Sequence, residues 1–158
     1  MVSKYGMGAM FLGAVALCGG CADTSGVSQA QRPGAAATAA KSLYDRLGGK
    51  PAITAVVDQF VANVAADQRI NSRFATTDLP KLKGHLVDQV CQATGGPCRY
   101  QGREMKATHL GMRISSADFG ALVQDLVAAL DTFKVPAGEK GELLALLGPM
   151  KKDIVELP

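Results

Sequence analysis

The chain has 158 residues, of which 47% are hydrophobic and 20% charged, and its formal net charge is +3. This length favours a single domain, and the composition is typical of a globular protein that can bury a core. The basic residues form no run and are not interleaved with aromatic ones, which argues against nucleic-acid binding.

The N-terminal part of the chain is predicted to direct export. An uncharged apolar run at 7–17 follows Lys4 and is too short to span a bilayer as a mature helix, which is typical of a secretory signal. The following letters, ALCGGCAD, resemble a bacterial lipoprotein signal with cleavage before Cys21 and lipidation of its thiol. Cys18 stands where such signals usually have an aliphatic residue, so ordinary signal cleavage is the alternative.

The stretch at 23–41 is small, polar and rich in alanine and glycine, and it lacks the apolar periodicity of a packed segment. We therefore expect a signal peptide at 1–20, a flexible tether at 21–41 and one domain at 42–158. The protein is expected to be exported to the periplasm or cell envelope and held to a membrane by its lipid.

The domain itself is predicted to be all-α. Apolar residues recur at three- and four-residue steps in four stretches, and no stretch alternates with period two. N-cap signals stand at Ser42, at 76–78 and at 115–118, and two or three shorter helices are expected, one of which carries Phe74 inward. The four stripes run over 53–64, 79–90, 119–133 and 143–155.

Glycine and proline mark where these helices stop. Gly48-Gly49 is expected to end the first short helix, and 95–97 (GGP) and 135–138 (VPAG) to end longer ones. Gly148-Pro149 falls inside the last stripe and is expected to kink that helix.

The stretch 101–114 (QGREMKATHLGMRI) holds His109, one of two histidines in the chain. On a helix, Met105 and Met112 would share the face of His109, and Gly111 could end that helix. A neutral imidazole at the wall of an apolar cavity is a candidate metal ligand. The alternative is a histidine that packs its ring and bonds a nearby carbonyl.

The order of these pieces resembles the truncated haemoglobins of group 1, from Ser42 to about Val155. The resemblance is carried by SLYDRLGGKPAITAVVDQFV, RINSRF, KLKGH, ATGGP, YQGREMKATHLGM and VPAGEKGELLALLGPMKKDIV. It implies a shortened globin in which two antiparallel helix pairs sandwich a b-type haem. The chain has no CxxCH motif, so covalent c-type attachment of the haem is not indicated.

The resemblance also assigns roles to residues. His109 matches the proximal iron ligand, and Phe74 matches the phenylalanine that packs on the haem face. Four cations are candidates for the haem propionates, with a solvated basic face as the alternative: Lys81, Lys83, Arg103 and Lys106. The expected pocket residues are Phe60, Val61, Phe74, Leu82, Leu86, Gln89, Val90, Met105 and Met112.

The chain departs from the family pattern on the distal side, which decides what the iron does. Val61 stands where many members have tyrosine, and Leu82 and Leu86 stand where glutamine is frequent. Without these donors, O₂ is expected to dissociate faster. Gln89 is a possible substitute donor, or else an exposed polar residue. His85 matches a position from which some members supply a second iron ligand, or else it lies at the pocket edge.

Cys91 and Cys98 flank the Gly-Gly-Pro turn, and in an exported protein we expect them to form a disulfide. Such a bridge would stabilise the fold by about 2–3 kcal/mol. The functional alternative is a redox-sensing pair beside the haem.

Three functions are compatible with these observations. The first is a globin that binds O₂, NO or CO, with NO oxidation as an option that would need an unidentified electron donor, because no flavin or nicotinamide motif is present. The second is electron transfer or redox sensing through iron held by His85 and His109. The third is a helical lipoprotein that has lost haem and acts as a binding module.

Overall fold

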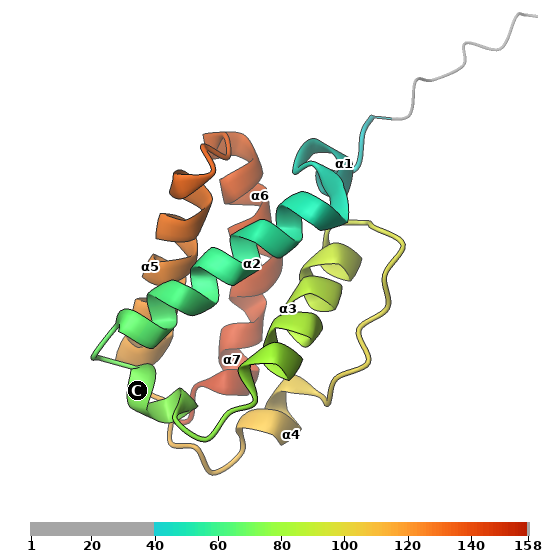
Figure 1. Cartoon of the computed structure of the whole chain (residues 1–158). Coiled ribbons are helices and arrows are strands. Elements are labelled where there is room, and N and C mark those ends of the chain that lie inside the picture. Colours follow the sequence, from blue (N-terminus) through green and yellow to red (C-terminus); the bar gives the residue numbers. More distant parts are fainter. Residues whose placement is uncertain (1–39, 158) are drawn as a thin grey trace, which may run out of the picture. The chain divides into compact units, whose positions relative to one another are not determined.

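The computed structural model describes residues 40–157, and all regular structure within that range is helical (Figure 1). One isolated bridge between Ser115 and Leu157 is the single β interaction in this part of the chain. The expected signal peptide at 1–20, Cys21 and nearly all of the tether lie outside the described residues. The helices are α1 Leu43–Arg46, α2 Gly49–Ala66, η1 Asn71–Phe74, α3 Leu79–Ala93, α4 Met105–His109, α5 Ser116–Thr132, α6 Ala137–Leu147, η2 Gly148–Met150 and α7 Lys151–Ile154, where η denotes a 3₁₀ helix.

The expected N-caps are present at two of the long helices. The Asp78 side chain accepts the backbone N–H of Lys81 at the start of α3. Ser115 and Asp118 form a reciprocal capping box at the start of α5. Hydrogen bonds from Ser115, followed by the nearby charge of Arg73, hold the pKa of Asp118 below its usual range. Arg73 pairs with this carboxylate at 2.7 Å, so η1 is tied to the start of α5.

The glycine pair at 48–49 does more than end α1. Arg46 is the last residue of α1, and Gly48 is the N-cap of α2 with a φ of +94°, in the left-handed region that glycine adopts without strain. The pair therefore lets two helices follow one another almost without a loop.

Helix α2 lies at the centre of the fold and packs against both α3 and α5 (Figure 1). Helix α3 packs along α2, and Lys140 of α6 forms an ion pair with Asp131 of α5. Phe133 is an exception to the expected stripe of α5, because it follows the last helical residue and is 45% exposed. The core is made by buried residues of α2 (Ile53, Val57, Phe60, Val61, Val64), α3 (Val87, Val90, Cys91), α5 (Ala121, Ala129, Leu130) and α6 (Leu143).

The last predicted helix is divided at the expected Gly148-Pro149. The chain passes through the single turn η2 before continuing as α7, and α7 packs against the short helix α4. Among residues 40–157, no helix combines the length and apolar character needed to cross a membrane.

Candidate functional site

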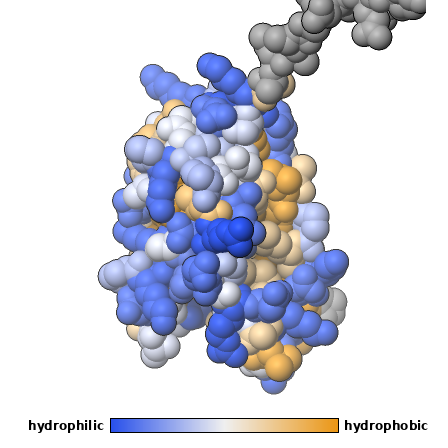
Figure 2. Space-filling view, turned by 90° about the vertical axis from the view of Figure 1, so that its right-hand side faces the viewer, coloured by the Kyte–Doolittle hydropathy of each residue, from blue (hydrophilic) through white to orange (hydrophobic). Residues whose placement is uncertain are grey.

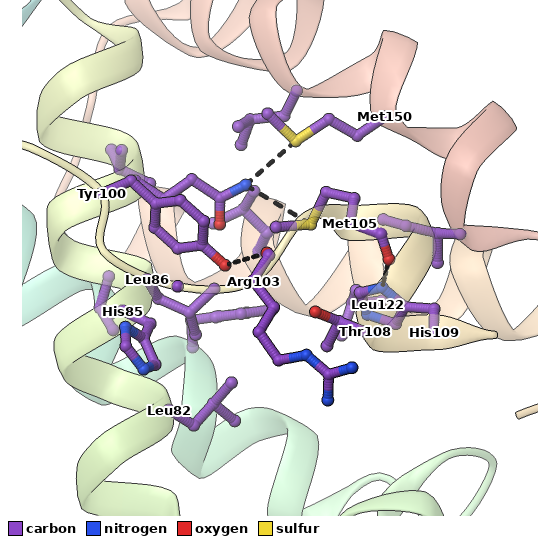
Figure 3. A pocket seen from close by; sticks show the side chains of 18 of the residues that line it. Leu82, His85, Leu86, Tyr100, Arg103, Met105, Thr108, His109, Leu122 and Met150 are labelled. Atoms are coloured by element: carbon purple, nitrogen blue, oxygen red, sulfur yellow. Dashed lines mark hydrogen bonds between the residues drawn. The ribbon is translucent and has the colours of Figure 1, made fainter.

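A cavity of about 550 Å³ lies between α3, α4, α5 and the end of the chain, and its lining is chiefly apolar (Figure 3). A second cavity of about 520 Å³ lies between α2, η1, α3 and α5. The two adjoin, because five residues line both: Phe60, Leu82, Leu86, His109 and Leu122. A flat apolar ligand can therefore reach from α4 to the α2 side of the protein.

His109 is the last residue of α4, and its ring borders both cavities. Its Nδ1 lies 2.7 Å from the carbonyl oxygen of Met105, one helical turn earlier. A carbonyl can only accept, so Nδ1 carries a proton, and in the neutral imidazole Nε2 then has the lone pair. A hydrogen bond that fixes the tautomer and direction of an imidazole in this way is typical of metal-ligating histidines. The carbonyl contact alone is equally compatible with a structural histidine.

The turn after His109 is held from two distant parts of the chain. The Glu156 carboxylate accepts the backbone N–H groups of Gly111 at 2.7 Å and Arg113 at 2.5 Å. These bonds favour the charged form and hold the pKa of Glu156 below its usual range. Arg73 donates from the other side to the Met112 carbonyl at 2.9 Å. The position of the ligand candidate therefore depends on polar contacts that lie outside the cavity.

Met112 does not lie at the cavity, contrary to the prediction. Helix α4 ends at His109, and Gly111 has a φ of +80°, so the helical spacing that would bring Met112 beside His109 is interrupted. Met112 is 40% exposed and its neighbour Leu110 is 74% exposed. Figure 2 shows apolar side chains at the lower end of the molecule, where Figure 1 places α4.

Opposite His109, helix α3 presents an apolar wall. Leu82 and Leu86 border both cavities, while Val61 from α2 borders only the second. None of these three side chains can donate a hydrogen bond, as the sequence indicates. Phe74 also lines the second cavity, and Val90 lines the first.

Gln89 lines the larger of the two cavities and is half-buried, and its amide is directed at two thioethers. The Nε2 atom is 3.1 Å from Sδ of Met150 and 3.8 Å from Sδ of Met105 (Figure 3). Thioether sulfur is a weak acceptor, so the amide is only weakly engaged. The Gln89 side chain therefore reaches from α3 to the side of the cavity that α4 and η2 form.

His85 lines the cavity on its α3 side, and Figure 3 shows it on the opposite side from His109. Its ring packs edge-on against Tyr100, with ring centroids 5.9 Å apart. Burial, and to a smaller extent the charge of Glu104, raises the pKa of Tyr100. The two histidines are thus brought to one cavity, but from different walls.

Two of the four cations predicted for the cavity edge line the cavity, namely Lys81 and Arg103. Lys83 does not, because its ammonium pairs with Asp58 on α2 at 2.8 Å. Lys106 is exposed on α4 and is absent from the cavity lining. Lys81 and Lys83 point in different directions because they are two positions apart on α3 and cannot share a helix face.

Several lining residues were missed by the sequence interpretation. Tyr100 and Thr108 border the cavity from the segment that precedes His109, and Met150 and Ile154 border it from η2 and α7. The apolar stripes of the two C-terminal stretches indicate which faces are buried but not what those faces cover. The remaining lining residues that were not predicted include Val57, Gln101, Gly102, Phe119, Leu122, Val123, Leu126 and Leu147.

Cys91 and Cys98 are joined by a disulfide, with Cα atoms 5.7 Å apart. Cys91 is completely buried near the end of α3. The bridge therefore fastens the start of the α3–α4 connection, residues 94–104, to the core.

The residues at the cavity fit the haem that the resemblance implies. His109 supplies one imidazole with a free Nε2 lone pair, as deduced from its bond to Met105. The surrounding side chains are apolar, and Lys81 and Arg103 bring positive charge to the lining. One imidazole, an apolar slot and a few cations are the set that a haem with two propionates requires.

Comparisons with known proteins agree with this geometry. A family model described as "Bacterial-like globin" matches residues 42–156. The group 1 truncated haemoglobin GlbN of Mycolicibacterium paratuberculosis is 36% identical over 113 residues, which cover 72% of this chain and 83% of that protein. The GlbN of a Nostoc species is also 36% identical, over 72% of this chain and 97% of that protein.

Solved structures of truncated haemoglobins have the same arrangement of helices as this chain. The Fe(III) form of truncated haemoglobin from Tetrahymena pyriformis superposes with a TM-score of 0.70 at 30% identity, covering 73% of this chain and 98% of that one. The 2/2 haemoglobin of a Synechococcus species, in the cyanomet state and with covalently attached haem, gives 0.69 at 32% identity, with coverage of 73% and 98%. These matches establish the two-on-two fold. The chain belongs to the bacterial-like globin family, within group 1 of the truncated haemoglobins, and is a haem-binding globin.

Proposed function

We propose that the protein binds haem b between α3 and α4, with His109 holding the iron, and that it binds a diatomic gas on the α3 side. The observation that carries this proposal is the place of His109, whose ring borders both apolar cavities while its Nδ1 bonds the Met105 carbonyl and leaves Nε2 available. When bound, haem supplies an iron centre at which O₂, NO or CO can be held.

Other side chains would determine how the haem is held in the cavity. Lys81 and Arg103 would hold the propionates through charge, since both line the cavity. Cys91 and Cys98 are bonded to each other, so neither offers a free thiol to the haem. We therefore propose that the haem is held without a thioether bond to either cysteine.

The apolar α3 wall determines how firmly a gas is held. Leu82, Leu86 and Val61 exclude water but donate nothing to a polar ligand such as O₂. A hydrogen bond to a partly charged group contributes about 1.5–3 kcal/mol, so its absence should speed O₂ dissociation by roughly tenfold to a hundredfold. We infer that the protein releases O₂ quickly, and that NO oxidation would require an external electron donor.

A second candidate function is electron transfer or redox sensing through iron held by both histidines. It is supported by His85, which borders the cavity on the wall opposite His109. This reading predicts slow gas binding, because His85 would have to leave before a gas could enter.

We further propose that the protein is exported and anchored by a lipid on Cys21. The disulfide between Cys91 and Cys98 supports an oxidising compartment, where such bonds persist. Cell fractionation tests this: the parent should be recovered with membranes and a Cys21→Ser variant should not. Equal recovery of both in the membrane fraction would contradict the anchor.

The haem and gas proposals are tested by titrating the purified protein with haem and recording absorption spectra of the ferric, reduced and CO forms. We expect uptake of one haem, a five-coordinate reduced form and rapid CO binding. A six-coordinate form that CO displaces slowly would favour the bis-histidine function. Failure to take up haem would contradict both and leave a helical binding module.

A further inference from the structure

The α3–α4 connection (residues 94–104) is fastened to α3 at two points. The disulfide joins Cys98 to the buried Cys91, and the backbone N–H of Tyr100 donates to Oε1 of Gln92 at 2.7 Å. Gly96 is required at the start of this segment, because a Cβ there would overlap Cys91 and the Tyr44 ring. The backbone around Tyr100 is therefore held in a defined place relative to α3.

The Tyr100 side chain is fixed as well. Its hydroxyl donates to the carbonyl oxygen of Arg103 at 3.0 Å, which closes a tight turn (Figure 3). Gly102 leaves the space that the ring occupies, because a Cβ at that position would overlap the ring atoms of Tyr100. With both its backbone and its hydroxyl bonded, the ring has little freedom to move.

This fixed ring is the contact that His85 makes at the cavity. The two rings pack edge-on with centroids 5.9 Å apart, and both residues border the cavity. Edge-on aromatic pairs are favourable beyond the area that they bury. A His85 side chain that turned toward the centre of the cavity would give up this contact.

We propose that Tyr100 is a positioning residue that holds His85 against the α3–α4 connection and so keeps His85 away from a bound haem, whose iron would then stay open to a gas. The inference rests on the proposed haem and gas binding and specifies what selects gas binding over the bis-histidine form. The disulfide acts through Tyr100, because it anchors the segment that carries the ring.

The effect of losing the contact follows from the typical strength of an aromatic pair. Removing the Tyr100 ring should raise the ratio of six-coordinate to five-coordinate iron by about two- to tenfold. CO binding should slow in proportion, since a gas enters only the open fraction. A Cys98→Ser variant loosens the anchor and should shift the ratio in the same direction by a smaller amount.

The test compares haem-loaded parent, Tyr100→Ala, Tyr100→Leu, Tyr100→Phe and the double variant Tyr100→Ala with His85→Ala. Electron paramagnetic resonance of the ferric forms gives the low-spin fraction, and flash photolysis gives the CO binding rate. We expect a low-spin increase in the Ala and Leu variants, a smaller increase in Tyr100→Phe, which keeps the ring but loses its hydroxyl bond, and a return to high spin in the double variant.

Two results would overturn the inference while leaving the proposed function intact. They are unchanged spin states in both the Ala and Leu variants that have taken up haem, and a low-spin signal that persists in the double variant. A parent already six-coordinate through His85 would also overturn the inference, and it would favour the second candidate function. Leu preserves apolar packing, so it decides the question if Tyr100→Ala does not fold. Failure of the parent itself to take up haem would instead contradict the proposed function, and the inference with it.

Discussion

The two walls of the proposed haem cavity are built by different means. The α4 wall is a helix of five residues that carries His109, and the turn that follows it is held by Glu156 from the end of the chain and by Arg73 from η1. The α3 wall is a capped helix of fifteen residues that presents Leu82 and Leu86 to the cavity.

The difference follows from helix length. A helix of five residues is too short to be stable by itself, so its place must be fixed by contacts from elsewhere. A helix of fifteen residues can be held by its own cap and its buried face. The wall that bears the proposed iron ligand is therefore a product of the tertiary structure, whereas the proposed gas-facing wall begins at a cap that the local sequence supplies.

The largest expected effect separates the two histidines. His109→Gly should speed haem loss by more than the roughly 10- to 100-fold that is typical of changes around a metal ligand, because the ligand itself is removed. The His85→Ala variant should lose haem at nearly the parent's rate. Haem transfer to an excess of apomyoglobin measures both rates. Equal rates of haem loss in the two variants would contradict the assignment of His109, and not His85, as the residue that holds the haem.

The next effect concerns the gas-facing wall. Val61→Tyr adds a hydroxyl beside the second cavity, and a hydrogen bond to bound O₂ should slow its dissociation by roughly tenfold to a hundredfold. Val61→Phe is the matched control, since it adds the same ring without the donor. Stopped-flow O₂ release distinguishes them. Equal slowing in both variants would attribute the effect to crowding rather than to hydrogen bonding.

A smaller effect is expected at the anchor of the α4 wall. Glu156→Ala removes the acceptor for the amides of Gly111 and Arg113, so these amides should exchange with solvent faster and haem loss should rise by less than about tenfold. Glu104→Ala is the control, because Glu104 lies at the other end of α4 and its side chain makes no capping bond. Unaltered exchange at Gly111 and Arg113 in Glu156→Ala would show that the carboxylate does not hold the turn.

The smallest effect lies away from both walls. Asp125 on α5 is buried with an unpartnered Oδ2, and burial, followed by the nearby charge of Asp67, raises its pKa. When a carboxyl group has a higher pKa in the folded than in the unfolded protein, the free energy of unfolding falls as pH rises from the unfolded pKa through the folded pKa. Asp125→Asn should therefore stabilise the fold at pH 7 by about 1 kcal/mol, and the gain should vanish below the ordinary aspartate pKa. Urea unfolding at several pH values measures this, and a gain independent of pH would contradict it.

The sequence alone predicts the long helices well but the cavity only in part. The stripes and the caps at Asp78 and Ser115 are local signals, and the structure has both caps. The position of Met112 was predicted wrongly, because the left-handed turn at Gly111 interrupts the helical spacing. The partner that Lys83 finds in Asp58 lies on another helix, and no local pattern indicates it.

The contacts of Tyr100 and Glu156 are even harder to predict from local sequence patterns. Glu156 reaches a turn that lies 43 to 45 residues earlier in the chain, and the sequence between them carries no sign of the contact. The role of Tyr100 depends on a disulfide and on space left by Gly102, both of which act only in the folded chain. Pocket residues that depend on such long-range contacts require the three-dimensional structure.

The most direct test of the account is to restore the missing imidazole from solution. His109→Gly should fold, bind haem poorly or with an altered spectrum, and recover the parent's reduced and CO spectra when free imidazole is added, because the cavity at α4 can then receive the ligand. Recovery would show that an imidazole at this wall is the axial ligand. A variant whose haem spectrum already matches the parent without imidazole would contradict the assignment of His109.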